Sequence, residues 1–148
     1  MFNLCILQAG PINKDLVLDY PSYDKMFSLL LKNKIKYWNI DIFNIYEDIF
    51  PKDLAYYNGF IITGSAYGVY ENYSWIKKLF DIIKKVFELK IPLIGICFGH
   101  QAIAQALGGQ VTKSSKGWGI GIKKIIIKKN KSLLGDFNKL NLIFFHQD

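Results

Sequence analysis

The seven residues Gly-Ile-Cys-Phe-Gly-His-Gln, at positions 95–101, constrain the fold of this chain more than any other stretch. The apolar run Ile91-Pro92-Leu93-Ile94 that precedes them predicts a short buried strand opened by a proline. The segment from Phe98 to Leu107 is rich in alanine and glutamine and runs into Gly108-Gly109, which predicts a helix with a glycine cap. Cys97 is therefore expected at a sharp strand-to-helix turn, where the flanking glycines permit a tight backbone.

A cysteine at such a turn is well placed for nucleophilic chemistry. The positive end of a helix dipole favours the thiolate over the thiol. The N–H of Phe98, directly after Cys97, is expected to point to where a tetrahedral oxyanion would form. The alternative is an inert buried thiol that packs as a small hydrophobic group. Cys5 fits that alternative, because it lies inside the strand-like segment Phe2 to Leu7 with no adjacent turn.

Strand and helix patterns alternate along the rest of the chain. Apolar residues at helical spacing in residues 73–90 predict one buried face, formed by Ile76, Leu79, Phe80, Ile83, Val86 and Phe87. Strands are expected at residues 2–9, 36–43, 58–63, 91–94, 110–112, 121–128 and 140–146, and helices at 23–34, 73–90 and 98–107. This order predicts an α/β fold with a doubly wound, mainly parallel sheet, and the lack of any linker predicts one domain over residues 1–148.

In sheets of this kind ligands gather at the carboxyl ends of the strands. Cys97, the loop Thr63-Gly64-Ser65 and His146 all follow or end a predicted strand. We therefore expect a site at that edge of the sheet.

Composition narrows the classes of function. A net charge of +7 and a pI near 9.3 suggest binding to nucleic acid. Every cationic side chain is a lysine, however, so bidentate recognition of guanine or phosphate by a guanidinium group is excluded. No nucleic-acid partner is therefore expected. No apolar run approaches the roughly 20 residues of a membrane helix, and two cysteines make no disulfide framework, so a cytoplasmic protein without membrane attachment is expected. No metal-ligand spacing or phosphate-binding loop occurs, so neither a metal nor a cofactor is expected.

Several motifs in order along the chain resemble class I glutamine amidotransferases, and more narrowly their stand-alone, GMP-synthase-like group. The central motif is Gly95-Ile96-Cys97-Phe98-Gly99-His100-Gln101, which is similar to the family pattern Gly-x-Cys-x-Gly-x-Gln. The other matching segments are Leu7-Gln8-Ala9-Gly10, Ile61-Ile62-Thr63-Gly64-Ser65, Trp75-Ile76, Ala102 to Gly109, Lys116 to Gly121 and His146-Gln147-Asp148. The resemblance implies a flavodoxin-like fold and hydrolysis of the side-chain amide of glutamine, or of a γ-glutamyl amide, through a cysteine thioester.

The resemblance also implies roles for individual residues. Cys97 would be the nucleophile, and the N–H groups of Gly64 and Phe98 would hold the oxyanion. Gln101, Trp118 and His146 would line the substrate. Released ammonia would pass to an unknown acceptor, in a synthetase domain or a partner protein, because nothing in the sequence predicts a nucleotide site.

The family's catalytic base comes from a His-Pro-Glu motif, and this sequence has only His100 and His146, neither of which precedes proline. We therefore expect that the C-terminal part of the domain is missing. A Cys97–His146–Asp148 triad is a conceivable substitute. It is disfavoured because the resemblance assigns His146 to a substrate-lining loop. His100, in the first turn of the predicted helix, is expected to tune the thiolate or to bond locally.

Two functions remain open at this point. The first is an amidotransferase-like enzyme that acts through Cys97. The second is a catalytically incomplete pseudoenzyme or gene remnant that binds a small amide ligand or a partner. The intracellular-protease-like superfamily shares the elbow architecture but lacks the combined cysteine and Thr-Gly-Ser patterns, and it ranks third.

Overall fold

The computed structural model describes residues 2–12, 14–16, 22–32, 37–127 and 139–147. They form two compact units, residues 1–111 and residues 112–148, and each unit is described by itself. Asn33, Lys34, Lys36, Lys128 and Asp148, at the ends of segments discussed above, lie outside the described residues.

The first unit is built on a four-stranded parallel sheet with the order β2-β1-β3-β4. Its strands are β1 (Phe2–Gln8), β2 (Trp38–Asn44), β3 (Gly59–Ile62) and β4 (Leu93–Gly95). Strand β1 pairs with both β2 and β3, and β3 pairs with β4 through Ile61 and Ile94. All four strands point the same way, so their carboxyl ends meet at one edge, as the sequence predicts.

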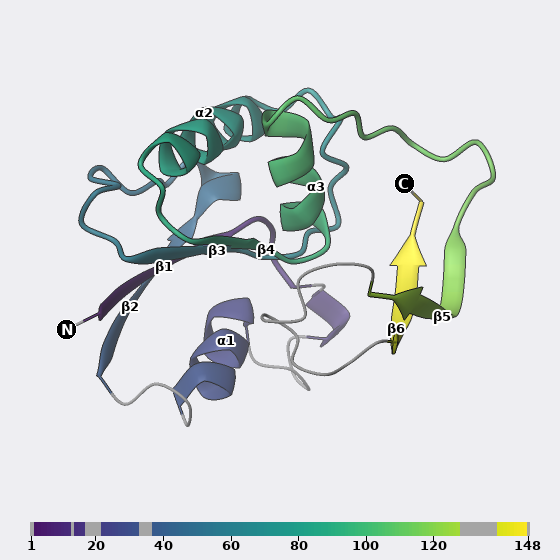
Figure 1. The fold of residues 1–148 in the computed structure, drawn as a ribbon, viewed down its shortest axis with the longest axis horizontal. Coiled ribbons are helices and arrows are strands. Elements are labelled where there is room, and N and C mark those ends of the chain that lie inside the picture. The colour runs from purple at the N-terminus through teal and green to yellow at the C-terminus, as the bar shows by residue number, and fades with distance from the viewer. Residues whose placement is uncertain (1, 13, 17–21, 33–36, 128–138, 148) are drawn as a thin grey trace. The chain divides into compact units, whose positions relative to one another are not determined.

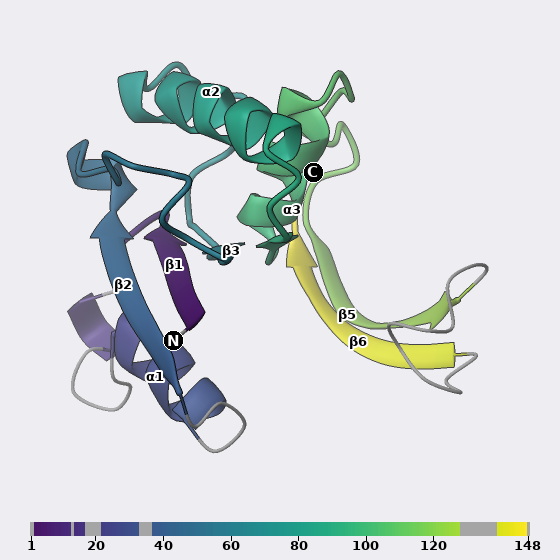
Figure 2. The same ribbon diagram turned by 60° about the vertical axis from the view of Figure 1, so that its left-hand side comes forward.

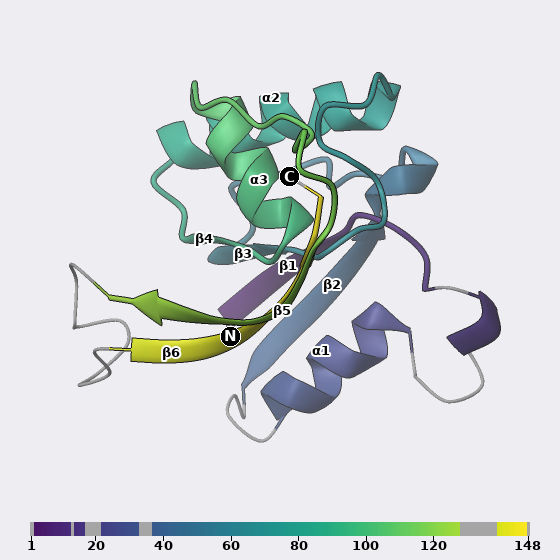
Figure 3. The same cartoon turned by 90° about the vertical axis from the view of Figure 1, so that its right-hand side faces the viewer.

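Helices cover both faces of this sheet, as expected for a doubly wound fold. Figure 1 shows α2 (Ser74–Glu88) and α3 (Phe98–Ala106) on one side and α1 (Tyr23–Lys32) on the other. Because side chains alternate along a strand, Cys5 and Leu7 of β1 belong to the core under α2 and α3. Leu4 and Ile6 belong to a smaller core with Phe27 and Leu31 of α1. Figure 3 shows α1 beside the paired strands β1 and β2.

Two predictions about buried side chains are wrong. Ile94 is 59% exposed, because it shares the face of Ile61, on which α1 packs against β1 and β2 rather than β4. Phe87 is 64% exposed, since at the end of α2 it borders an open apolar groove with Ile103 and Leu107. The other residues predicted for that face of α2 are buried, apart from the partly buried Phe80.

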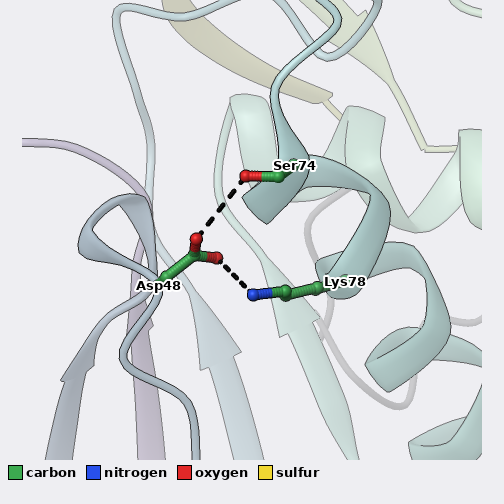
Figure 4. Close-up of polar contacts among 3 residues, drawn as sticks. All are labelled: Asp48, Ser74 and Lys78. Carbon is green, nitrogen blue, oxygen red and sulfur yellow. Dashed lines mark hydrogen bonds and ion pairs between the residues drawn. The ribbon is translucent and has the colours of Figure 1, made fainter.

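The start of α2 is anchored from outside the sheet. The 3₁₀ turn η2 (Ile45–Glu47) follows β2 and ends at Asp48, which adopts a left-handed conformation with φ of 62°. Figure 4 shows that the Asp48 carboxylate accepts hydrogen bonds from Ser74 Oγ at 3.5 Å and Lys78 Nζ at 2.9 Å. These bonds tie the end of β2 to the first turn of α2.

The second unit is a two-stranded antiparallel sheet of β5 (Gly119–Ile126) and β6 (Lys139–His146), which run side by side in Figure 2. The strands pair from Gly119 with His146 to Ile126 with Lys139. The strand predicted at residues 110–112 is wrong, because these residues are irregular. Val111 N–H instead donates a hydrogen bond to Gln105 Oε1 at 2.8 Å, so the segment is held by a side chain of α3 and not by a sheet ladder.

Candidate active site

Cys97 occupies the turn between β4 and α3 in a strained backbone conformation. Its φ is 50° and its ψ is −108°, whereas Asp48, also at positive φ, has a ψ of 19° that lies near the left-handed helical well. Such a conformation costs on the order of 1–3 kcal/mol and persists only where the surroundings impose it. The Cys97 side chain is exposed. The combination of strain and exposure is that of a nucleophile elbow.

Gly95 and Gly99 allow this turn by leaving room for close backbone contact. A methyl group on Gly95 would lie 2.3 Å from the carbonyl carbon of Gly99. A methyl group on Gly99 would lie 2.5 Å from the carbonyl oxygen of Ile62 in β3. Neither glycine has positive φ, so the turn needs their lack of a side chain and not their conformational freedom. The glycine spacing around Cys97 thus reflects the packing of α3 directly on β3.

Backbone hydrogen bonds hold the turn on both sides of the cysteine. Ile96 N–H donates to Ile62 O at 3.0 Å, which joins the end of β4 to β3. Gly99 N–H donates to Ile96 O at 2.9 Å, and Gln101 N–H donates to Cys97 O at 3.1 Å. Phe98 is the first residue of α3, so its N–H is among those that no carbonyl of the helix can satisfy. That N–H is available to an oxyanion at the helix start.

The loop after β3 is tied to the loop after β1 by two hydroxyl groups. The buried Thr63 hydroxyl accepts a hydrogen bond from Ala9 N–H at 2.9 Å and donates one to Gly64 O at 2.9 Å. The Ser65 hydroxyl donates to Ala9 O at 2.7 Å and accepts from Tyr67 N–H at 3.1 Å. These four bonds fix the backbone on both sides of Gly64.

Gly64 lies directly beside Cys97. A methyl group added to Gly64 would be 3.6 Å from Cys97 Cβ, an ordinary van der Waals distance. The structure therefore brings together Cys97, Gly64 and Phe98, from two loops at the carboxyl edge of the sheet. Gln101 lies in α3 one turn beyond the cysteine and is partly buried. Its neighbour His100 is exposed.

The two thiols of the chain have opposite environments. Cys5 is fully buried in β1, and burial raises the pKa of its thiol, with a further contribution from the Asp41 carboxylate on β2. Desolvation disfavours the thiolate that a nucleophile needs. Cys5 is a core residue, as expected, and Cys97 is the exposed thiol.

Trp118 and His146 belong to the second unit, where they lie at the same end of the β5–β6 pair. Trp118 precedes Gly119, the cross-strand partner of His146, and its ring lies 4.8 Å from that of Phe145. The His146 ring is 6.1 Å from that of Phe144. Next to His146, the carbonyl of Gln147 accepts a hydrogen bond from Ser114 N–H at 2.6 Å. The two predicted substrate-lining residues thus lie at the same end of the strand pair, but their rings contact residues on opposite faces of it.

Thr63 and Ser65 were not predicted from the sequence as individual site residues. Their hydroxyl groups form the bonds that shape the Gly64 loop, although they contact no reacting group. The available signal was their position: hydroxyl residues on both sides of a glycine after a buried strand often bond to nearby backbone. Among the described residues, no cluster of three or more histidine, cysteine or acidic side chains is arranged to hold a metal ion. In the same part of the chain, no helix has the length and apolar character needed to cross a bilayer.

The family profile described as glutamine amidotransferase class-I matches residues 19–148, which include the elbow, the Gly64 loop and both strands of the second unit. The chain belongs to the class I glutamine amidotransferase family. The amidotransferase resemblance noted in the sequence is thereby confirmed.

Relatives and solved structures agree with this membership. Gamma-glutamyl peptidase 4 of Arabidopsis thaliana is 37% identical over 137 residues, which cover 87% of this chain and 54% of the peptidase. The GMP synthase [glutamine-hydrolyzing] of Borreliella burgdorferi strain N40 is 34% identical over 142 residues, 90% of this chain and 25% of the synthase. A glutamine amidotransferase from Thermotoga maritima has the same fold, with a TM-score of 0.76 at 21% identity over 99% of this chain and 60% of that chain.

The chain spans about half the length of the γ-glutamyl peptidases that it matches. Its parallel sheet flanked by helices is the α/β, flavodoxin-like architecture that the resemblance implies, and the fold prediction is confirmed.

Proposed function

We propose that this amidotransferase chain hydrolyses a γ-glutamyl amide, with Cys97 as the nucleophile. The proposal is supported mainly by the close approach of Gly64 to the strained turn at Cys97, where a methyl group added to Gly64 would lie 3.6 Å from Cys97 Cβ. An exposed thiol thus lies beside the backbone of Gly64 and Phe98, whose N–H groups are the proposed oxyanion donors. A thiol with backbone donors beside it is suited to acyl transfer.

The proposed reaction has two steps, formation of a thioester and its hydrolysis. The Cys97 thiolate attacks the amide carbon, and the N–H groups of Gly64 and Phe98 stabilise the oxyanion. The C–N bond then breaks, the amine leaves with the proton that a base took from the thiol, and a γ-glutamyl thioester remains. Water attacks the thioester, the C–S bond breaks, and glutamate and the thiol are released. Gln101 is proposed to hold the glutamyl part of the substrate, and the family resemblance alone supports a substrate-binding role for Trp118 and His146.

The names of the relatives favour the γ-glutamyl group as the shared part of the substrate. One relative is named a γ-glutamyl peptidase and another a glutamine-hydrolysing GMP synthase. Both names describe cleavage of an amide at the γ-carbonyl of a glutamyl group, and they differ in the leaving amine. Where that amine is ammonia, an acceptor domain or a synthetase partner would receive it.

The second candidate is a protein that binds the amide without turnover. This candidate concerns the 148 residues by themselves, in which no His-Pro-Glu sequence occurs. The reaction needs a base that takes a proton from the thiol and from water and gives one to the leaving amine, and this motif supplies the base in the family that the sequence resembles.

Covalent labelling tests the proposal directly. The probe is a glutamine analogue with a chloromethyl ketone in place of the amide, which alkylates a bound thiolate as the C–Cl bond breaks. We expect one adduct, located on Cys97 by peptide mass spectrometry and absent from Cys97→Ser. A chain whose Cys97 reacts with iodoacetamide but not with this probe overturns the proposal.

Turnover is measured separately, as ammonia or amine release from glutamine and from γ-glutamyl dipeptides. Release that is lost in Cys97→Ser supports the hydrolase. Labelling of Cys97 without any release supports the binding protein instead.

A further inference from the structure

Four aromatic side chains form a continuous array behind the elbow. Tyr67 lies in the Gly64 loop, Tyr73 and Trp75 lie at the start of α2, and Phe98 is the first residue of α3. The Trp75 ring lies 5.6 Å from that of Tyr67, 6.4 Å from that of Tyr73 and 5.6 Å from that of Phe98. Tyr67 and Tyr73 are in edge contact at 5.1 Å. Trp75 contacts the other three members, so it is the centre of the array.

The array joins the two turns that carry the proposed oxyanion donors. On one side, the N–H of Tyr67 bonds to the Ser65 hydroxyl, and Ser65 follows Gly64. On the other side, Phe98 carries both a ring in the array and the second N–H donor. Trp75 thus lies in ring contact with both sides, with Tyr67 of the Gly64 loop and with Phe98 after Cys97.

Trp75 is itself held in place. It is 5% exposed, and Phe98 is 2% exposed, so neither ring has room to move independently of its neighbours. Ser74, directly before Trp75, and Lys78 one turn later both bond to Asp48 (Figure 4). The first turn of α2 is therefore fixed on its outer side by these bonds and on its inner side by the array.

We infer that Trp75 is a positioning residue for the proposed reaction, which fixes Phe98 and thereby the oxyanion site beside Cys97. This inference rests on the proposed function. Cys97 has a backbone conformation that its surroundings must impose, and the ring of the next residue is buried against Trp75. Loss of the indole leaves Phe98 free to shift, and a displacement of about 1 Å at a catalytic donor lowers a rate by about 100-fold.

The test compares two reagents on the full chain. Iodoacetamide needs only an exposed thiol. The glutamine chloromethyl ketone also places its carbonyl oxygen at the oxyanion site. In Trp75→Leu we expect the rate of Cys97 labelling by the ketone to fall by about 10- to 100-fold, while the rate with iodoacetamide changes by less than about 3-fold. Trp75→Phe restores an aromatic ring and is expected to recover most of the ketone rate.

Ile83→Ala is the matched control, because Ile83 is fully buried on the same helix, eight residues further along. It lowers stability without removing a member of the array, so the ratio of the two rates stays unchanged. Should Trp75→Leu fail to fold by circular dichroism, Tyr67→Leu replaces it, since Tyr67 is only partly buried and the same loss of ratio is expected in smaller degree.

Each outcome has one meaning. An unchanged ratio in the folded array variant, or an equal change in Ile83→Ala, overturns the positioning role and leaves the proposed function standing. A wild-type chain that reacts with iodoacetamide but not with the ketone overturns the proposed function and this inference with it.

Discussion

Replacing Gly99 with alanine is expected to destabilise the chain far more than an ordinary glycine substitution in a helix. The new methyl group would lie 2.5 Å from Ile62 O and 2.8 Å from Ile62 Cβ, about 0.9 Å short of the 3.4 Å at which ordinary contact with the oxygen begins. Neither side gives way easily, because Ile62 is fully buried in β3 and its carbonyl also accepts the Ile96 N–H. Helix α3 must therefore move off the sheet, which costs about 3 kcal/mol, at the upper end of overpacking in a core.

Urea unfolding followed by circular dichroism measures this cost. With a slope of about 2 kcal/mol per molar, the midpoint of Gly99→Ala is expected to fall by about 1.5 M. Gly108→Ala is the control: no atom lies within 4 Å of the added methyl, and only its φ of 96° opposes the change. That strain of about 1 kcal/mol moves the midpoint by about 0.5 M. Equal shifts in the two variants would refute the steric reasoning.

Three further predictions concern the site and the two thiols. Gly64→Ala adds a methyl group 3.6 Å from Cys97 Cβ, an ordinary contact, so the free energy of unfolding is expected to change by less than about 1 kcal/mol. Labelling of Cys97 by the glutamine chloromethyl ketone is expected to slow by at least about 10-fold. Equal labelling rates in the variant and the wild type would contradict this prediction. Thr63→Val removes the buried hydroxyl that binds Ala9 N–H, so urea unfolding shows a loss of about 1–3 kcal/mol, and Thr63→Ser retains most of the stability. The pKa of Cys5 is raised in the folded state, so above pH 9 the thiol ionises in the unfolded state first. The free energy of unfolding is therefore expected to fall by up to about 1.4 kcal/mol per pH unit in that range. A Cys5→Ala chain should lose stability less steeply in the same pH series.

The parts of the fold that were predictable have a local cause. Strand β1 and helix α2 follow from apolar runs and helical spacing, and the elbow follows from glycines around a cysteine between a strand and a helix. The exposure of Ile94 and Phe87 was not predictable in this way. It depends on which parts of each sheet face α1 and the neighbouring helices cover, and periodicity within one segment does not contain that information.

In the site, too, the features with a local cause were predictable and those that depend on distant segments were not. The position of Cys97 at a helix start was predictable from neighbouring residues. The bonds from Thr63 and Ser65 to Ala9 join residues more than fifty positions apart, and they depend on the pairing of β1 with β3. Residues 110–112 were mistaken for a strand because their composition fits one, whereas the Gln105 side chain of α3 accepts a hydrogen bond from Val111 N–H.

The strained backbone of Cys97 lowers the stability of the protein, and the same residue carries the exposed thiol. A φ of 50° with a ψ of −108° is unfavourable for any residue with a side chain, and glycine alone would adopt it without strain. The residue that would best stabilise the turn is therefore one that has no thiol. Selection of variants for thermal stability alone would favour glycine at this position, and the stabilised protein would have lost its proposed nucleophile.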